Sequence, residues 1–134
     1  IEKMSFVRKP FIHYVQRANS ISNSQNKKNE EMFTVLDNVI KYYKEKNIYE
    51  KFQQELEYTY TRYLLCSSLK RISKIKDKRT RLELVEKTWN NLNKVFPEWK
   101  KNNILNKHHT IKNLYIKTIN KNTIKIYSNV INKI

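Results

Sequence analysis

Residues 58–69 read YTYTRYLLCSSL, a segment that is apolar almost all round when it is wound as an α-helix. Helical spacing of apolar residues continues on both sides, through Phe52 and Ile72, and the whole predicted helix has about 28 residues, roughly 42 Å. Asn47 and Glu50 have the spacing of a capping box, which predicts where this helix begins. We expect Arg62, which interrupts the apolar surface, to pair with an acid or to reach solvent. A helix that is apolar on all sides is typical of the centre of a bundle.

Two further long helices are predicted beside this one. Asn29 can cap a helix with Glu30 and Glu31 in its first turn, where the helix dipole favours acidic residues. Asp77 can cap another helix, which Pro97 ends. The expected core positions are Phe33, Leu36, Val39, Ile40 and Tyr43 in the first helix and Leu82, Val85, Trp89, Leu92 and Phe96 in the second.

The two ends of the chain have weaker patterns. Two short helices are predicted over residues 111–119 and 124–131, with a break at Asn120–Asn122. Near the start, Phe6-Val7 and Phe11–Val15 flank Pro10 and predict short extended stretches, followed by a polar loop. Because two such strands are not stable alone, we expect them to be the edge of a larger sheet. The fold class is therefore mainly α: three main helices plus shorter C-terminal helices, preceded by a short β-like remnant.

Composition narrows the function classes. The 134 residues include no glycine, although about nine would be expected at an average usage of about 7%. This absence excludes the glycine-rich phosphate loops of P-loop and dinucleotide-binding proteins from the chain. The first residue, Ile1, is not Met, and we expect the chain to be cut from something longer.

The net charge is +16, and Lys, Asn and Ile together supply 54 of the 134 residues. Such usage is typical of AT-rich codons, which favour these three amino acids. A cluster of basic residues at the turn between the second and third helices leaves three interpretations open: a solvated face, an anionic membrane surface or nucleic acid. The cluster consists of Lys70, Arg71, Lys74, Lys76, Lys78, Arg79 and Arg81.

Few residues are candidates for binding a metal ion or for catalysis. His108 and His109 are adjacent and point about 100° apart on a helix, so they are poor metal chelators. Asp37 and Asp77 are the only aspartates. Cys66 is the single cysteine, lies beside two leucines, and is predicted to be a buried thiol in a reducing compartment. We expect the chain to be non-catalytic on its own.

Residues 9–22 read KPFIHYVQRANSIS and resemble the stretch that ends the catalytic domain of bacterial family 2 glycosyltransferases, where a Pro and an aromatic strand precede Tyr-x-x-Arg-x-x-Ser-Ile. Later segments resemble the helical C-terminal extension of these enzymes. They are Ile48–Phe52, Glu57-Tyr58, Arg62–Leu65 and Phe96–Asn102, and the likeness covers about 100 residues.

This resemblance implies transfer of a sugar from a nucleotide-diphosphate donor to a glycan or lipid-linked acceptor in cell-surface polysaccharide synthesis. Residues 1–26 would end the catalytic domain, and residues 27–134 would form a C-terminal helical accessory domain. Arg17, with Gln16 and Ser20 beside it, would lie in the loop near the donor diphosphate. His13 lies earlier than the histidine that many family members use as a metal contact.

The resemblance also implies partners and a place in the cell. The nucleotide-sugar and a divalent metal would belong to the parent enzyme and its N-terminal catalytic domain. The location would be cytoplasmic, with peripheral attachment to the inner face of the membrane as a further expectation. The alternative function is a basic helical interaction module that binds nucleic acid or an anionic membrane surface, nucleic acid being the less favoured partner.

Overall fold

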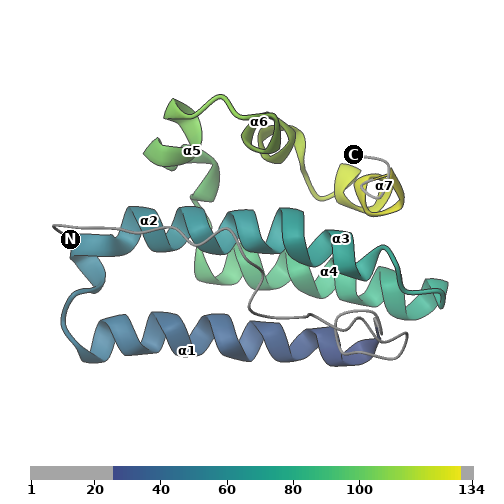
Figure 1. The fold of residues 1–134 in the computed structure, drawn as a ribbon, viewed down its shortest axis with the longest axis horizontal. Coiled ribbons are helices and arrows are strands. Elements are labelled where there is room, and N and C mark those ends of the chain that lie inside the picture. Colours follow the sequence, from purple (N-terminus) through teal and green to yellow (C-terminus); the bar gives the residue numbers. More distant parts are fainter. Residues whose placement is uncertain (1–25, 131–134) are drawn as a thin grey trace, which may run out of the picture.

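The computed structural model describes residues 26–130, which form a bundle of helices covered on one side by a layer of shorter ones (Figure 1). The expected extended stretches around Pro10 lie outside these residues, and within them there is no strand. Their elements are η1 (Lys27–Glu30), α1 (Glu31–Glu45), α2 (Tyr49–Arg62), η2 (Tyr63–Ser68), α3 (Leu69–Ile72), α4 (Lys78–Val95), η3 (Trp99–Lys101), α5 (Asn103–Lys107), α6 (Ile111–Thr118) and α7 (Thr123–Val130).

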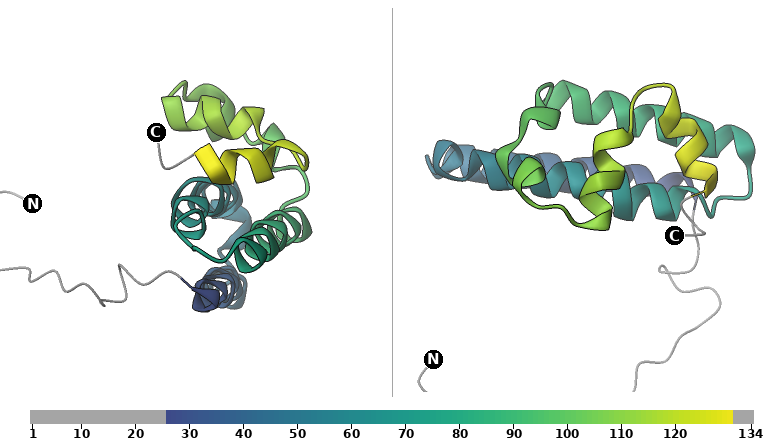
Figure 2. Two further views of the ribbon diagram at one scale, coloured as in Figure 1. Left: turned by 90° about the vertical axis from the view of Figure 1, so that its right-hand side faces the viewer. Right: turned by 90° about the horizontal axis from the view of Figure 1, so that it is seen from above.

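The predicted mainly α bundle is confirmed. Helix α1, the continuous α2–η2–α3 helix and α4 are each antiparallel to the one before (Figure 1). The end-on view in Figure 2 shows the three at the corners of a triangle. Helices α5, α6 and α7 cross over α2–α3 and α4 on the side away from α1 (Figures 1 and 2). The central helix is therefore in contact with α1, with α4 and with the short-helix layer.

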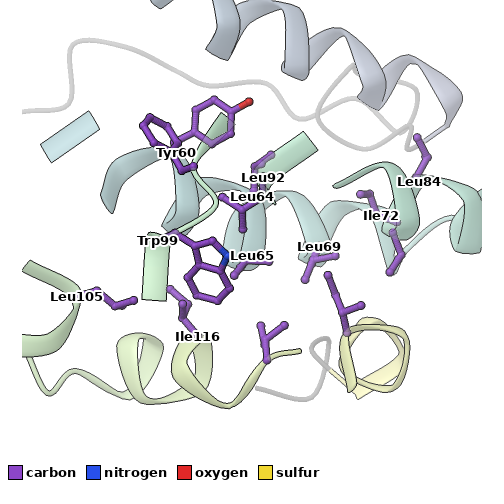
Figure 3. Close-up of a cluster of buried hydrophobic side chains, with 14 of the residues drawn as sticks. Tyr60, Leu64, Leu65, Leu69, Ile72, Leu84, Leu92, Trp99, Leu105 and Ile116 are labelled. Atoms are coloured by element: carbon purple, nitrogen blue, oxygen red, sulfur yellow. The ribbon is translucent and has the colours of Figure 1, made fainter. Parts of the chain in front are cut away.

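Residues 58–69 are mostly buried or half-buried, as predicted, but part of the segment is not an α-helix. Leu64, Leu65 and Leu69 are fully buried, and Figure 3 shows Leu64 beside Leu92, with Leu65 and Leu69 directed toward the short-helix layer. Residues 63–68 are wound as a π-helix rather than an α-helix, and the Leu69 N–H reaches back to the Leu64 carbonyl. The wider turn lies where the helix meets α4 on one side and α6 on the other.

Tyr60 joins the three long helices at one point. Its ring is buried and packs edge-to-face on Phe96, with ring centroids 5.2 Å apart. Its hydroxyl lies 3.1 Å from Asp37 Oδ1 on α1 and also contacts Asn91 on α4. Burial, and then the Asp37 carboxylate, raise the pKa of this phenol above its ordinary value. The hydroxyl therefore stays protonated and fixes the relative positions of the three helices.

Two predicted helix starts are wrong. The cap before α1 is Asn26 rather than Asn29, because a 3₁₀ turn precedes α1 and the Asn26 side chain accepts a hydrogen bond from the Lys28 N–H. The capping box of Asn47 and Glu50 does not form, since the residue at the cap of α2 is Ile48 and it provides no side-chain bond. Asp77, in contrast, caps α4 as predicted and accepts from the Thr80 N–H at 2.7 Å.

Asn47 ends α1 instead of starting α2. Its φ of 53° is the only positive one among the described residues. The N–H groups of Asn47 and Ile48 bond to the carbonyls of Lys44 and Tyr43, which is the Schellman pattern that glycine usually provides. In a chain without glycine, asparagine is the residue that tolerates this left-handed conformation best. The turn between α1 and α2 depends on it.

The remaining differences concern exposed positions and one short helix. Val39, expected in the core, is 41% exposed, because α1 is at the edge of the bundle and only the sector around Ile40 is buried. Arg62, which was expected to pair with an acid or to reach solvent, is half-buried and donates to the Tyr58 hydroxyl at 3.3 Å. Helix α5 was not predicted, whereas the break at Asn120–Asn122 is confirmed between α6 and α7.

Replacing Asn47 tests whether the α1–α2 turn depends on its left-handed backbone. We expect Asn47→Ala to lower the free energy of unfolding by about 1 kcal/mol, because Cβ without a polar side chain disfavours this conformation. Asn47→Gly should leave it unchanged or higher. Urea unfolding followed by circular dichroism measures both, with Asn90→Ala on the exposed side of α4 as the control. Equal effects of Ala and Gly at position 47 would contradict the assignment.

Candidate functional site

The residues expected beside a donor diphosphate, Gln16, Arg17 and Ser20, lie outside the described residues, as does His13. The structure does place the segments that carry the rest of the family resemblance. Ile48–Phe52, Glu57-Tyr58 and Arg62–Leu65 follow one another along α2 and η2. Phe96–Asn102 crosses from α4 to α5 and packs against α2. These separate sequence segments therefore form one structural junction.

Asn102 holds this junction together. Its side-chain N–H groups donate to the Glu57 carboxylate at 2.8 Å and to the Gln54 carbonyl at 2.9 Å. Its side-chain oxygen accepts from the N–H groups of Ile104 and Leu105 and so caps α5. Both Glu57 and Asn102 are buried, and a buried carboxylate is stable only when it is hydrogen-bonded. This pair was not predicted from the sequence, although asparagine is a preferred N-cap residue.

Trp99 is the apolar half of the same junction. It is 1% exposed, and Figure 3 shows its indole between Leu65 of the central helix and Leu105 and Ile116 of the short-helix layer. The indole lies edge-to-face with Trp89, with ring centroids 6.3 Å apart. The segment around Trp99 therefore serves packing, and its aromatic ring is not available to stack on a ligand.

The basic cluster of residues 70–81 lies at the turn between α3 and α4. Its residues are exposed apart from Arg81, whose guanidinium donates to the Ile75 carbonyl at 2.8 Å and so closes the turn. The ion pairs found within residues 26–130 use other lysines: Lys41, Lys87 and Lys101. Arg71 donates to the Tyr63 hydroxyl at 3.4 Å. The lysines of the cluster and Arg79 are exposed, as on a solvated face or an anion-binding surface.

A hollow of about 240 Å³ lies between α4 and the start of α7. Glu86 and Trp89 line it from α4, and Lys121 and Lys125 line it from the other side. It is smaller than the roughly 300–1,000 Å³ that ligand pockets occupy. Its three charged residues, Glu86, Lys121 and Lys125, are exposed to solvent. This hollow therefore carries no catalytic assignment.

Cys66 is half-buried in the π-helical turn. Burial raises the pKa of its thiol, and the nearby charges of Arg62 and Lys112 oppose that shift only in part. Burial likewise raises the pKa of the neighbouring Tyr115 phenol. Cys66 is therefore half-buried rather than fully buried as predicted, and a thiol with a raised pKa is a poor nucleophile at neutral pH.

Residues 26–130 contain no group of three or more His, Cys, Asp or Glu side chains that could hold a metal ion. In the same part of the chain, no helix is long and apolar enough to cross a membrane. Comparison with protein-family models, with curated proteins and with solved structures gives no match to this chain. The junction around Asn102 and the charged surfaces are thus the features of the described residues that bear on function.

Removal of the Asn102 side chain should destabilise the fold. Asn102→Ala leaves the Glu57 carboxylate buried without this donor and uncaps α5, so we expect the free energy of unfolding to fall by about 2–4 kcal/mol. Asn103→Ala is the matched control, because that neighbouring side chain is exposed, and it should change stability by less than about 0.5 kcal/mol. A double-mutant cycle with Glu57→Ala should give a coupling of about 1 kcal/mol or more. Independent effects of the two substitutions would contradict the contact.

The reactivity of Cys66 should follow its raised pKa. At pH 8 we expect alkylation by iodoacetamide to be slow and to accelerate at higher pH, where the thiolate forms. The control is Ser67→Cys in a Cys66→Ser background, since position 67 is exposed on the same turn. The control thiol should react several-fold faster, and unfolding in urea should remove the difference. Equal rates in the folded proteins would show that Cys66 is accessible.

Proposed function

We propose that this chain is the C-terminal helical region of a glycosyltransferase that transfers a sugar from a nucleotide-diphosphate donor to a glycan or lipid-linked acceptor. In this proposal the described helices perform no chemistry. They support the end of the catalytic domain and the loop that carries Arg17. The catalytic groups, the nucleotide-sugar and the divalent metal would belong to the parent enzyme.

The observation that supports the proposal best is the junction around Asn102. Phe96–Asn102 is far along the chain from the other three later segments that resemble the helical extension of family 2 glycosyltransferases, yet it packs on the helix that carries them. Asn102 bonds directly to Glu57 across 45 positions. Short motifs that match by chance have no reason to meet in space, whereas the motifs of one structural unit do.

The structure also provides an anchor for the proposed donor loop. Asn26 caps η1, and Glu30 in η1 bonds to Lys87 of α4 at 2.9 Å. Glu30 and Glu83 both hydrogen-bond the Lys87 ammonium and raise its pKa, so the lysine stays charged. Arg17 precedes Asn26 by nine residues, a length that spans at most about 30 Å when it is fully extended. The bundle would therefore tether one end of a loop that closes over a diphosphate.

The reading frame upstream of Ile1 tests this proposal directly. The proposal requires a segment of catalytic-domain size in that frame, with an Asp-x-Asp after a hydrophobic strand. In the protein so encoded, we expect Arg17→Ala to lower kcat/KM for the nucleotide-sugar by roughly 10- to 100-fold, because a charged hydrogen bond to a phosphate is lost. Arg17→Lys should recover only part of the loss, since lysine cannot make a bidentate contact.

The control for Arg17 is Arg8→Ala, an arginine outside the segment that carries the resemblance. It should leave the kinetics unchanged. An upstream frame without an Asp-x-Asp would overturn the glycosyltransferase proposal. Unchanged donor affinity and transfer rate in Arg17→Ala would remove Arg17 from the donor site and leave the family proposal standing.

A further inference from the structure

The short-helix layer has an unusual charge distribution. From α5 to the end of α7, residues 103–130 contain five lysines and two histidines but no Asp, Glu or Arg. The lysines are Lys107, Lys112, Lys117, Lys121 and Lys125. Figure 1 shows α5, α6 and α7 gathered on one side of the bundle, opposite α1. The only formal charges on the short-helix layer within residues 103–130 are therefore positive.

Apolar side chains stand on the outer surface of this layer. Ile111 is 78% exposed, Leu114 49% and Ile126 62%. On α6, Ile111 and Leu114 lie opposite the buried Asn113 and Ile116, so they point away from the core. A surface helix normally places polar residues at these positions. The chain thus exposes aliphatic side chains where nothing in the fold requires them.

Helices α6 and α7 form one platform rather than two independent helices. Tyr115 and Tyr127 pack edge-to-face with ring centroids 5.1 Å apart. Thr118 Oγ1 lies 2.9 Å from the Tyr127 hydroxyl. Ile126, on α7, lies opposite the buried Ile124 and is therefore directed outward. The exposed aliphatic side chains of both helices are consequently held in a fixed arrangement.

We propose that the outer surface of α5–α7 docks onto an anionic lipid bilayer. Ile111, Leu114 and Ile126 insert at the level of the lipid headgroups, and the surrounding lysines, among them the exposed Lys112 and Lys121, contact the phosphates. The helices lie on the membrane, since none of those described is long and apolar enough to span it. This inference does not depend on the glycosyltransferase proposal.

The side-chain types favour lipid over nucleic acid. A nucleic-acid surface typically uses Arg for phosphates and exposed aromatic rings for stacking. The α5–α7 segment contains no Arg, and its two tyrosines, Tyr115 and Tyr127, are half-buried against each other. Branched aliphatic side chains have no stacking face, whereas they partition well into an acyl-chain boundary.

The test is co-sedimentation of the full chain with vesicles of phosphatidylcholine alone and of phosphatidylcholine mixed with phosphatidylglycerol, at low and high salt. We expect binding to the anionic vesicles only, weakened by salt. A triple variant, Ile111→Ser, Leu114→Ser and Ile126→Ser, should bind more weakly by on the order of tenfold for each side chain removed. Because these side chains are exposed, circular dichroism should show an unchanged fold.

Helix α1 supplies a matched control. Val35, Val39 and Tyr42 are exposed to a similar degree, 60%, 41% and 54%, but on the opposite side of the bundle. Serine at these three positions should leave vesicle binding unchanged. Lys112→Glu with Lys121→Glu should remove the preference for anionic lipid.

Several results would overturn the proposal. They are absence of binding to either vesicle, equal losses in the α6–α7 and α1 triple variants, and binding that depends on the lysines but not on the aliphatic side chains. Tighter binding of duplex or single-stranded DNA through the same lysines would assign the surface to nucleic acid. A dimer in analytical ultracentrifugation that the α6–α7 triple variant dissociates would show that a second copy of the chain covers this surface.

Discussion

Burial of the leucine-rich part of the α2–η2–α3 helix is the constraint on which the rest of the structure depends. Leu64, Leu65 and Leu69 have no exposed surface. Because α1 and α4 cannot bury all three side chains, a third neighbour must cover the remaining side. Helices α5–α7 supply that cover, with Trp99 and Ile116 packed against the leucines (Figure 3). The C-terminal helices are thus part of the core, although each is too short to be stable alone.

Asparagine takes several positions at helix ends and turns in this chain that glycine often takes in other proteins. Asn47 takes the left-handed position that ends α1. Asn26 and Asn102 cap helices through their side chains, and Asn120 accepts from the N–H groups of Asn122 and Thr123 in the turn before α7. A short amide side chain can bond nearby backbone and tolerates turn conformations, so the helices can be closed without glycine. A composition that AT-rich codons favour is therefore put to structural use.

Local patterns predicted the fold because the signals that begin and end helices lie within a few residues. Asp77 and Pro97 bracket α4, and the stripe from Val85 to Phe96 is buried as its spacing indicated, with Trp89 half-buried. The contact between Glu57 and Asn102 joins positions 45 apart, and no local pattern specifies which distant polar group a buried carboxylate will meet. The π-helical turn at Tyr63–Ser68 likewise reflects packing from two sides at once, which a single-helix pattern does not encode.

Codon bias would account for the abundance of lysine, but it would not account for the positions of the acidic residues. Residues 26–98 carry sixteen Lys and Arg with eleven Asp and Glu, whereas residues 99–130 carry seven Lys and no acid. Surface acids are readily tolerated on solvated helices, and Lys87 shows how the bundle uses them in ion pairs. The helices that lack acidic residues are the same ones on which Ile111 and Ile126 are exposed. Charge segregation and misplaced apolar side chains on one surface are two independent departures from a solvated face, and an anionic apolar partner accounts for both.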